Sequence, residues 1–170
     1  MPPTTPTPGR FASVSSSGSS QPGSYAVQIA KLQGAAPIIV ADRSKAALRR
    51  ASALGADEVI HATAGVSIGR EVRMLADGGA DVSLEFVGAA ATVDAAVKSL
   101  RPGGRAVAAG VGVEPLTTLA PVVWSANEYE LRGAFGSLPG DIERVLGWLA
   151  DGTVQPPHTA DVALSDAAPA

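Results

Sequence analysis

An acid at the end of a short apolar run is the strongest chemical signal in this sequence. The run Ile38–Ala41 ends at Asp42, and Gly23 lies 19 residues before that acid. In dinucleotide-binding proteins, an acid about 20 residues past a glycine loop accepts hydrogen bonds from the adenosine ribose. The spacing therefore predicts that Asp42 binds the ribose of NAD. Gly23 would then begin the helix whose free amide groups face the pyrophosphate.

Asp42 also has a structural interpretation, as a loop acid that helps to cap the helix beginning near Ser44. As a ligand, its carboxylate would repel a 2′-phosphate and so favour NAD over NADP. Arg43 could stack on the adenine, but its charge could also attract a 2′-phosphate, which weakens that preference. The residues alone leave both interpretations of Asp42 open.

The first half of the dinucleotide-binding pattern is not recognisable. A buried strand and a G-x-G-x-x-G loop should precede Gly23, yet residues 13–22 read SVSSSGSSQP. The first strand and the glycine loop are therefore predicted to be missing or degenerate. Residues 1–22, rich in Pro, Ser and Thr, are expected to be disordered, because they carry little apolar surface to bury. Residues 12–16 are the part expected to lie nearest the resulting gap.

Glycine-bearing segments follow three predicted strands. Ligands of open parallel sheets bind outside the carboxyl ends of the strands, and glycine lets a cofactor approach the backbone closely. Each of these glycines is also compatible with an ordinary strand end. Taken together, they predict a cofactor border formed by Phe86, Val87, Gly88, Ala109, Gly110, Val111, Phe135 and Gly136.

No catalytic constellation emerges from the remaining polar residues. Glu85 lies in an apolar strand, His61 ends a strand and His158 lies near two prolines, and none has a partner at a telling spacing. The chain has no cysteine, so it has no thiolate ligands. The sequence predicts neither a catalytic residue nor a metal site.

Strand-like and helix-like patterns alternate at short spacing. This alternation predicts an α/β fold with a doubly wound parallel sheet over residues 23–157, followed by a short tail at 158–170. In the last helix, expected at 141–150, four apolar residues should face inward: Ile142, Val145, Leu146 and Leu149. Residues 111–129 are expected to be irregular, and Val162–Leu164 resembles the start of a further strand. Strands are expected at 38–42, 58–61, 82–86, 105–109 and 130–135.

Composition narrows the class of protein. A chain of 170 residues with 46% hydrophobic and 4% aromatic residues is expected to form one domain with an aliphatic core. A net charge of −3 makes nucleic acid or an anionic membrane an unexpected partner. The sequence has neither an apolar run of about 20 residues nor a signal peptide, so we expect a cytoplasmic protein.

Several blocks of sequence resemble the cofactor domain of the zinc-type medium-chain alcohol dehydrogenases. They are GSYAVQIAKL at 23–32, IIVADRS at 38–44, ALGADEVI at 53–60, GADVSLEFVG at 79–88 and LRPGGRAVAAG at 100–110. The similarity extends from about Gly23 to about Leu164.

This resemblance implies a Rossmann fold with strand order 3-2-1-4-5-6 that binds NAD in an oxidoreductase of alcohols or aldehydes. It implies that Asp42 binds ribose and that Gly88, Gly110 and Phe135-Gly136 border the adenosine and nicotinamide. It also implies a homo-oligomer formed partly by edge pairing of the last strand.

The same resemblance implies an incomplete protein. The family's preceding catalytic domain, which supplies the Cys, His and acid ligands of the catalytic zinc, has no counterpart here. We therefore expect a truncated cofactor-binding fragment that is inactive alone, which leaves its status as an enzyme uncertain. Two alternatives remain open: an S-adenosylmethionine-dependent methyltransferase, which shares the acid and a turn like Pro102–Gly104, and a non-enzymatic nucleotide-binding fragment.

Overall fold

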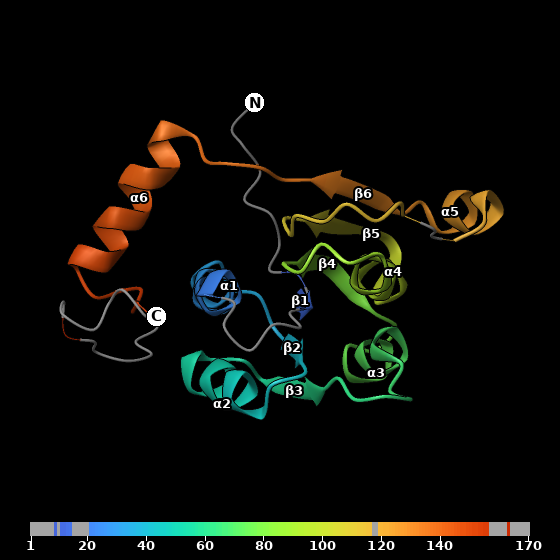
Figure 1. Cartoon of the computed structure of the whole chain (residues 1–170), viewed down its shortest axis with the longest axis horizontal. Coiled ribbons are helices and arrows are strands. Elements are labelled where there is room, and N and C mark those ends of the chain that lie inside the picture. Colours follow the sequence, from blue (N-terminus) through green and yellow to red (C-terminus); the bar gives the residue numbers. More distant parts are fainter. Residues whose placement is uncertain (1–8, 10, 15–20, 117–118, 157–162, 164–170) are drawn as a thin grey trace.

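A computed structural model describes residues 9, 11–14, 21–116, 119–156 and 163. Within these residues, strands and helices alternate (Figure 1). In chain order the elements are β1 (Phe11–Val14), α1 (Gln21–Leu32), β2 (Ile38–Asp42), α2 (Lys45–Leu54), β3 (Glu58–His61), α3 (Ile68–Leu75), β4 (Ala80–Glu85), α4 (Ala90–Lys98), β5 (Leu100–Ala108), α5 (Pro121–Asn127), β6 (Glu130–Gly133) and α6 (Pro139–Ala150).

The strands form one parallel sheet in the order β3-β2-β1-β4-β5-β6. This is the doubly wound α/β fold predicted from the sequence, with the strand order that the resemblance implies. Helices α1 and α2 lie on one side of the sheet, and α3 and α4 lie on the other (Figure 1). Such an arrangement brings the carboxyl ends of all six strands to the same edge.

The central strand is present at Phe11–Val14, so these four residues are ordered, whereas most of residues 1–20 lie outside the described part of the chain. β1 pairs with β2 on one side, where Phe11 is in register with Ile38, and with β4 on the other, where Phe11 is in register with Val82. The two neighbours supply a backbone ladder on each edge of this short strand, which satisfies its backbone groups. Residues 15–20, where the glycine loop was expected, lie outside the described residues.

Helix α1 begins at Gln21, two residues before the predicted start at Gly23. Proline at the second helical position fits this start, because the first turn does not need its N–H group. Gly23 is buried within the first turn of the helix.

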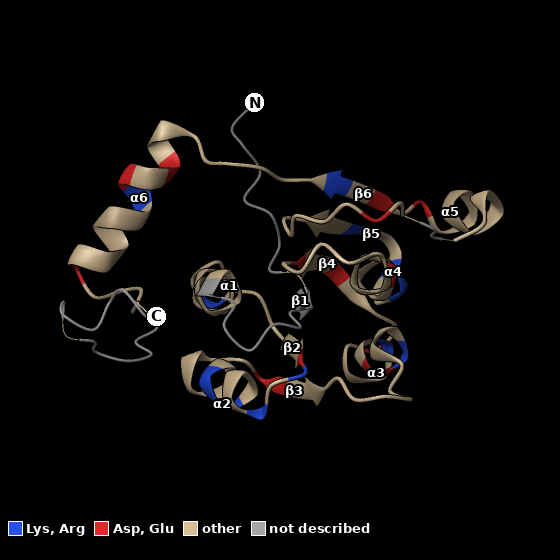
Figure 2. Cartoon of the chain, viewed as in Figure 1, with Lys and Arg blue, Asp and Glu red and all other residues tan. Residues whose placement is uncertain are grey.

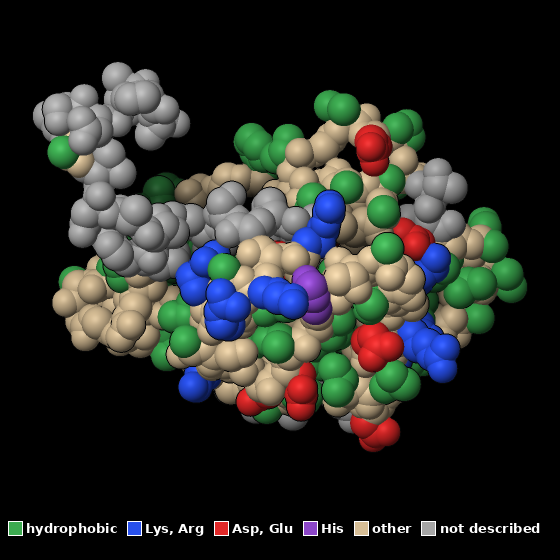
Figure 3. Space-filling view, turned by 60° about the horizontal axis from the view of Figure 1, so that its bottom comes forward, with side chains coloured by type: hydrophobic (Ala, Val, Ile, Leu, Met, Phe, Trp, Pro, Cys, Tyr) green, Lys and Arg blue, Asp and Glu red, His purple; other side chains and the backbone are tan. Residues whose placement is uncertain are grey.

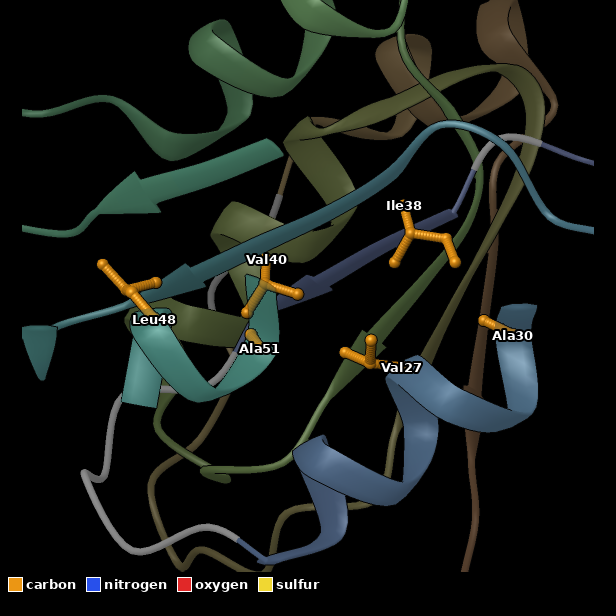
Figure 4. Close-up of a cluster of buried hydrophobic side chains, with 6 residues drawn as sticks. All are labelled: Val27, Ala30, Ile38, Val40, Leu48 and Ala51. Atoms are coloured by element: carbon orange, nitrogen blue, oxygen red, sulfur yellow. The ribbon is translucent and has the colours of Figure 1, made fainter. Parts of the chain in front are cut away.

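β2 is buried on both faces, as strands covered by helices on two sides must be. Ile38 and Val40 face α1 and α2 in one apolar cluster, where they meet Val27, Ala30, Leu48 and Ala51 (Figure 4). Ile39 and Ala41 belong to the opposite cluster, with Ile60, Val72, Ala76 and Ala80. The core on this part of the sheet is aliphatic, as the composition predicts.

The caps predicted for α2 are confirmed. The hydroxyl of Ser44 accepts a hydrogen bond from Ala47 N at 3.3 Å, and Gly55 ends the helix with φ of 112°. Glycine is favoured there because the left-handed conformation strains any residue with a Cβ.

The segment predicted to be irregular contains a short helix, α5, which begins at a proline. Its Trp124 packs edge to face on Tyr129, with ring centroids 6.0 Å apart. Tyr129 belongs to a third cluster with Ala96, Val97, Leu100 and Ala106. In α5, the adjacent residues Val123 and Trp124 pack against this cluster, whereas Val122 is 72% exposed. Two adjacent inward residues in a helix of seven do not produce a helical repeat of apolar residues, so the sequence pattern did not reveal the helix.

β6 is the last strand of the sheet and is held to β5 by charge as well as by the backbone. Arg105 Nε lies 2.7 Å from Glu130 Oε2 in the in-register pair, and Arg132 Nε lies 3.1 Å from the same oxygen. The side-chain hydrogen bond from Arg105 lowers the pKa of the Glu130 carboxyl. Both partners are exposed, so the pair contributes little to stability.

Helix α6 contradicts the prediction that its apolar residues face inward. No residue of α6 is buried, and Ile142 and Leu146 are 51% and 59% exposed. Val145 and Leu149, the other two residues predicted to face inward, are only half-buried. The helix stands apart from the sheet in Figure 1. The amphipathic pattern was read correctly, but a pattern cannot show whether a partner for the apolar face is present.

The segment after α6 is anchored to α1 by one side-chain amide. Gln28 Nε2 donates to Gln155 O at 2.9 Å, and Gln155 N donates to Gln28 Oε1 at 2.7 Å. Gln28 is 7% exposed and Val154, next to the anchored residue, is 1% exposed. The reciprocal pair satisfies both backbone groups of Gln155 and fixes the position at which the chain leaves α6. Val162 and Leu164 lie outside the described residues, so the expected further strand stays a prediction.

Two buried serines allow a matched test of the core. Ser83 and Ser99 are both 0% exposed, but Ser83 Oγ has no hydrogen-bond partner among the described residues, whereas Ser99 Oγ donates to Ala96 O at 2.6 Å. Ser83→Ala should raise the free energy of unfolding by about 1 kcal/mol, since it removes an unsatisfied buried hydroxyl. Ser99→Ala should lower it by about 1 kcal/mol. Urea unfolding measures both, and a destabilised Ser83→Ala variant would contradict this description of the core.

Candidate cofactor site at the carboxyl edge of the sheet

Four strand ends that matter for the predicted site meet at one edge of the sheet. β2 ends at Asp42, β4 at Glu85, β5 at Ala108 and β6 at Gly133. In open parallel sheets this edge carries the ligand crevice, and the point between β1 and β4 is where the strand order reverses. The structure thus brings most of the sequence-predicted residues to the edge where chemistry is expected.

Asp42 lies at this edge with its side chain 1% exposed. Its Oδ1 accepts a hydrogen bond from Ser44 N at 2.7 Å, and its carbonyl oxygen accepts one from Ala62 N at 3.0 Å. The structural interpretation of this acid is therefore confirmed, because it closes the turn that leads into α2. The second carboxylate oxygen keeps its capacity to accept further hydrogen bonds.

Arg43 is exposed and lines a hollow of about 460 Å³. The other lining residues follow β3 and β4, among them Ala62, Thr63, Ala89 and Thr92. The backbone around Arg43 is held by His61, whose Nε2 lies 3.0 Å from Arg43 O. Figure 3 shows Lys and Arg side chains gathered beside a histidine on the face turned forward. A hollow of this size, with a guanidinium at its rim, suits a flat heterocycle or an anionic group.

Glu85 organises the loop that follows β4. It is 1% exposed, and its Oε1 accepts hydrogen bonds from Val87 N at 2.7 Å, Gly88 N at 2.9 Å and Thr92 Oγ1 at 2.7 Å. A carboxylate buried away from water must find such donors, because leaving it unsatisfied costs several kcal/mol. The result is a tight turn that carries the chain from β4 into α4.

The backbone of Glu85 holds the neighbouring loop as well. Its carbonyl oxygen accepts hydrogen bonds from Ala109 N at 2.8 Å and Gly110 N at 3.0 Å. One residue therefore joins the loops after β4 and β5, using its carboxylate for one and its carbonyl for the other. These two loops contain six of the residues predicted to border the cofactor.

Glycines let the two loops pack backbone against backbone. Gly88 has φ of 83°, and a Cβ added there would lie 2.5 Å from the carbonyl carbon of Val111. A Cβ on Gly110 would overlap the backbone of Val87 and Gly88. The sequence pattern attributes these glycines to the close approach of a cofactor. The structure gives another reason, because the two loops themselves lie too close together for a side chain.

The remaining predicted residues lie apart from this pair of loops. Phe135 is 95% exposed, and Gly136, with φ of 70°, has open space where a Cβ would be. They follow β6 at the outer end of the sheet, and Ala134 N donates to Ala108 O at 2.9 Å. Phe86, Ala109 and Val111 flank the joined glycines, and Gly23 lies in the first turn of α1.

Sequence reasoning missed Glu85 and Thr92 as organisers of the site. Glu85 was noted only as an acid without a visible partner, because its partners are backbone amides, which leave no mark in a sequence. A usable signal was present: an acid that ends an apolar strand, followed by glycine three residues later and by threonine seven residues later.

The residues present do not fit a catalytic zinc ion. The chain has no cysteine, and in the described part of the chain no group of three or more His, Cys, Asp or Glu side chains could hold a metal. No reaction step is therefore assigned to a metal on this chain. Helices long and apolar enough to cross a membrane are likewise not found among the described residues.

The parallel sheet, its order and the joined loops at its carboxyl edge define a Rossmann-type domain of the dehydrogenase class. The sequence profile of the zinc-binding dehydrogenases matches residues 23–151. The chain belongs to this family. The methyltransferase alternative is therefore not supported.

Known relatives agree with this assignment. Sorbitol dehydrogenase of Gallus gallus is 34% identical over 122 residues, which cover 70% of this chain and 34% of the relative. The alcohol dehydrogenase TADH of Thermus sp. ATN1 superposes with a TM-score of 0.78 at 35% identity, over 88% of this chain and 42% of that one. A zinc-binding dehydrogenase of Sinorhizobium meliloti 1021, solved with NADP, gives 0.76 at 26% identity, over 89% and 44%. The chain thus spans less than half the length of these relatives.

Substituting Glu85 tests its organising role. Glu85→Gln keeps the shape but turns an NH₂ group or a weaker acceptor toward the converging donors. The free energy of unfolding should fall by about 1–3 kcal/mol, as expected for loss of charge-assisted hydrogen bonds in a buried site. Thr92→Val, which removes only the hydroxyl donor, should cost about 1 kcal/mol.

Chemical unfolding of both variants beside the parent chain gives the comparison. An unchanged or raised stability of Glu85→Gln would show that the buried carboxylate is not needed to hold the two loops.

Proposed function

We propose that this chain binds NAD at the carboxyl edge of its sheet and serves as the cofactor-binding domain of an alcohol dehydrogenase-like oxidoreductase. The single observation that carries the proposal is the joined pair of loops organised by Glu85, at the same edge of the sheet as Asp42 and separated from it by the central strand β1. Family membership and relatives that act on alcohols support the same function.

In this proposal each residue group has a separate task. Asp42 accepts hydrogen bonds from the adenosine ribose through the carboxylate oxygen that Ser44 leaves free. Arg43 and the hollow it lines take the adenine. The loops of Val87–Gly88 and Gly110–Val111 shield the cofactor from water on the side of β4 and β5, and Gly23 and Phe135-Gly136 border it further out.

The bound NAD would supply the hydride acceptor, and this chain would bind and orient it. An alcohol or aldehyde is the proposed substrate of the complete oxidoreductase, whose sorbitol and alcohol dehydrogenase relatives are longer than this chain. The chain alone is proposed to be inactive. Pairing of copies through the outer edge of β6 remains a proposal drawn from the resemblance, and a place in the cytoplasm remains a proposal drawn from the sequence.

Preference between NAD and NADP distinguishes this proposal from general anion binding. A carboxylate near the 2′ position repels a phosphate, so NAD should bind more tightly than NADP. Asp42→Asn keeps an acceptor for Ser44 N but removes the charge. It should weaken NAD binding about ten-fold, since hydrogen bonds to charged groups contribute about 1.5–3 kcal/mol. It should also reduce the ratio of the affinity for NAD to the affinity for NADP.

Calorimetric titration of the full chain with NAD, NADP and S-adenosylmethionine measures these affinities. Glu143→Gln on α6 is the matched control, because it removes an exposed acid away from the site. Failure of NAD to bind, or NAD binding that Asp42→Asn leaves unaltered, would refute the proposed role of this edge.

A further inference from the structure

A second hollow lies between α3, α4 and α5, and it shares Lys98 with the hollow beside Arg43. It has a volume of about 500 Å³ and is lined by Arg70, Arg73, Met74, Lys98, Leu119 and Val123. Lys98 ends α4 just before β5 begins, so the hollow lies toward the amino ends of the strands. Asp42 and the loops joined by Glu85 lie at the opposite edge.

The charged residues of this hollow are all cations. Figure 2 shows basic residues on both α3 and α4. Lys98 is paired with Asp94, with Nζ and Oδ2 2.7 Å apart. Arg70 and Arg73 have no carboxylate partner in the described part of the chain, so the hollow carries an excess of positive charge.

Arg73 is held in place by neutral acceptors. Its Nε donates to Lys98 O at 2.8 Å and its Nη2 donates to Tyr129 Oη at 2.6 Å. These bonds fix the plane of the guanidinium, and Nη1 has no partner among the described residues. An oriented guanidinium with free donors is the group that proteins use to bind carboxylates.

The rest of the lining is apolar. Met74 is 60% exposed although it is a large hydrophobic residue, and Leu119 and Val123 complete an apolar wall beside it. Water against this surface is unfavourable, and a hydrocarbon segment would cover it. Methionine suits such a role because its side chain adapts to irregular apolar ligands.

From this combination we propose that the hollow between α3, α4 and α5 binds an amphipathic carboxylate, with its head group on Arg70 and Arg73 and its hydrocarbon chain on Met74, Leu119 and Val123. Charge complementarity selects the anionic head, and the apolar wall selects the tail. A ligand with only the anionic head or only the hydrocarbon tail would complement one kind of lining residue and leave the other uncovered. Arg70, Arg73 and Met74 do not line the hollow beside Arg43, so the proposed ligand and NAD would rest on different side chains.

Calorimetric titration of the full chain with decanoate tests the proposal. Decanoate should bind at a single site, while acetate, which lacks the tail, and decanol, which lacks the charge, should each bind at least about ten-fold more weakly. Saturating NAD should leave the decanoate affinity unchanged. No saturable decanoate binding, equal binding of decanol, or competition with NAD would overturn the proposal.

Substitutions place the ligand in the hollow. Arg70→Gln removes an exposed cation that makes no ion pair within the described part of the chain, and it should weaken decanoate binding about five-fold. Met74→Glu should weaken it more, because it places an acid in the apolar wall. Arg49→Gln, on the exposed surface of α2, is the control and should change nothing. Decanoate binding that is insensitive to both Arg70→Gln and Met74→Glu would likewise overturn the proposal.

Discussion

The carboxyl edge of this domain depends on one buried acid, Glu85, which accepts hydrogen bonds from the loops after β4 and β5. Glu85 ends the strand next to the centre of the sheet, and its carboxylate and carbonyl together hold the loops after β4 and β5. Because a desolvated carboxylate is stable only when donors surround it, the loop after β4 cannot open without exposing that cost. The loop after β5 is held to it by the backbone carbonyl of Glu85, which accepts hydrogen bonds from Ala109 N and Gly110 N. Gly88 and Gly110 follow from this constraint, since larger residues would separate the two backbones.

The sheet itself is stabilised unevenly. β2 is buried on both faces by aliphatic residues, whereas β1 relies on backbone pairing with β2 and β4. At the outer end, β6 is held by backbone pairing with β5, to which the exposed Arg105–Glu130 pair adds little, and α6 contributes no buried residue.

Much of this could be predicted from the sequence, for identifiable reasons. The end of β2 at Asp42, the caps of α2 and the alternation of strands and helices are encoded in short local patterns, and the structure confirms them. For β1 the sequence predicted only a missing or degenerate strand with residues 12–16 near the gap, because pairing with β2 and β4 leaves no mark in a local pattern. The partners of Glu85 were missed because they are backbone amides. The exposure of Ile142 and Leu146 was missed because periodicity identifies an apolar face without identifying what covers it.

Amide hydrogen exchange at the two loops tests the central claim most directly. If Glu85 joins the loops as described, the amides of Val87, Gly88, Ala109 and Gly110 should exchange only through openings as costly as those of β4 and β5. The amide of the exposed Gly136, also on a turn after a strand, should exchange fast. Exchange of the four loop amides at the rate of Gly136 would contradict the account, because it would show that the buried carboxylate does not hold this edge of the sheet together.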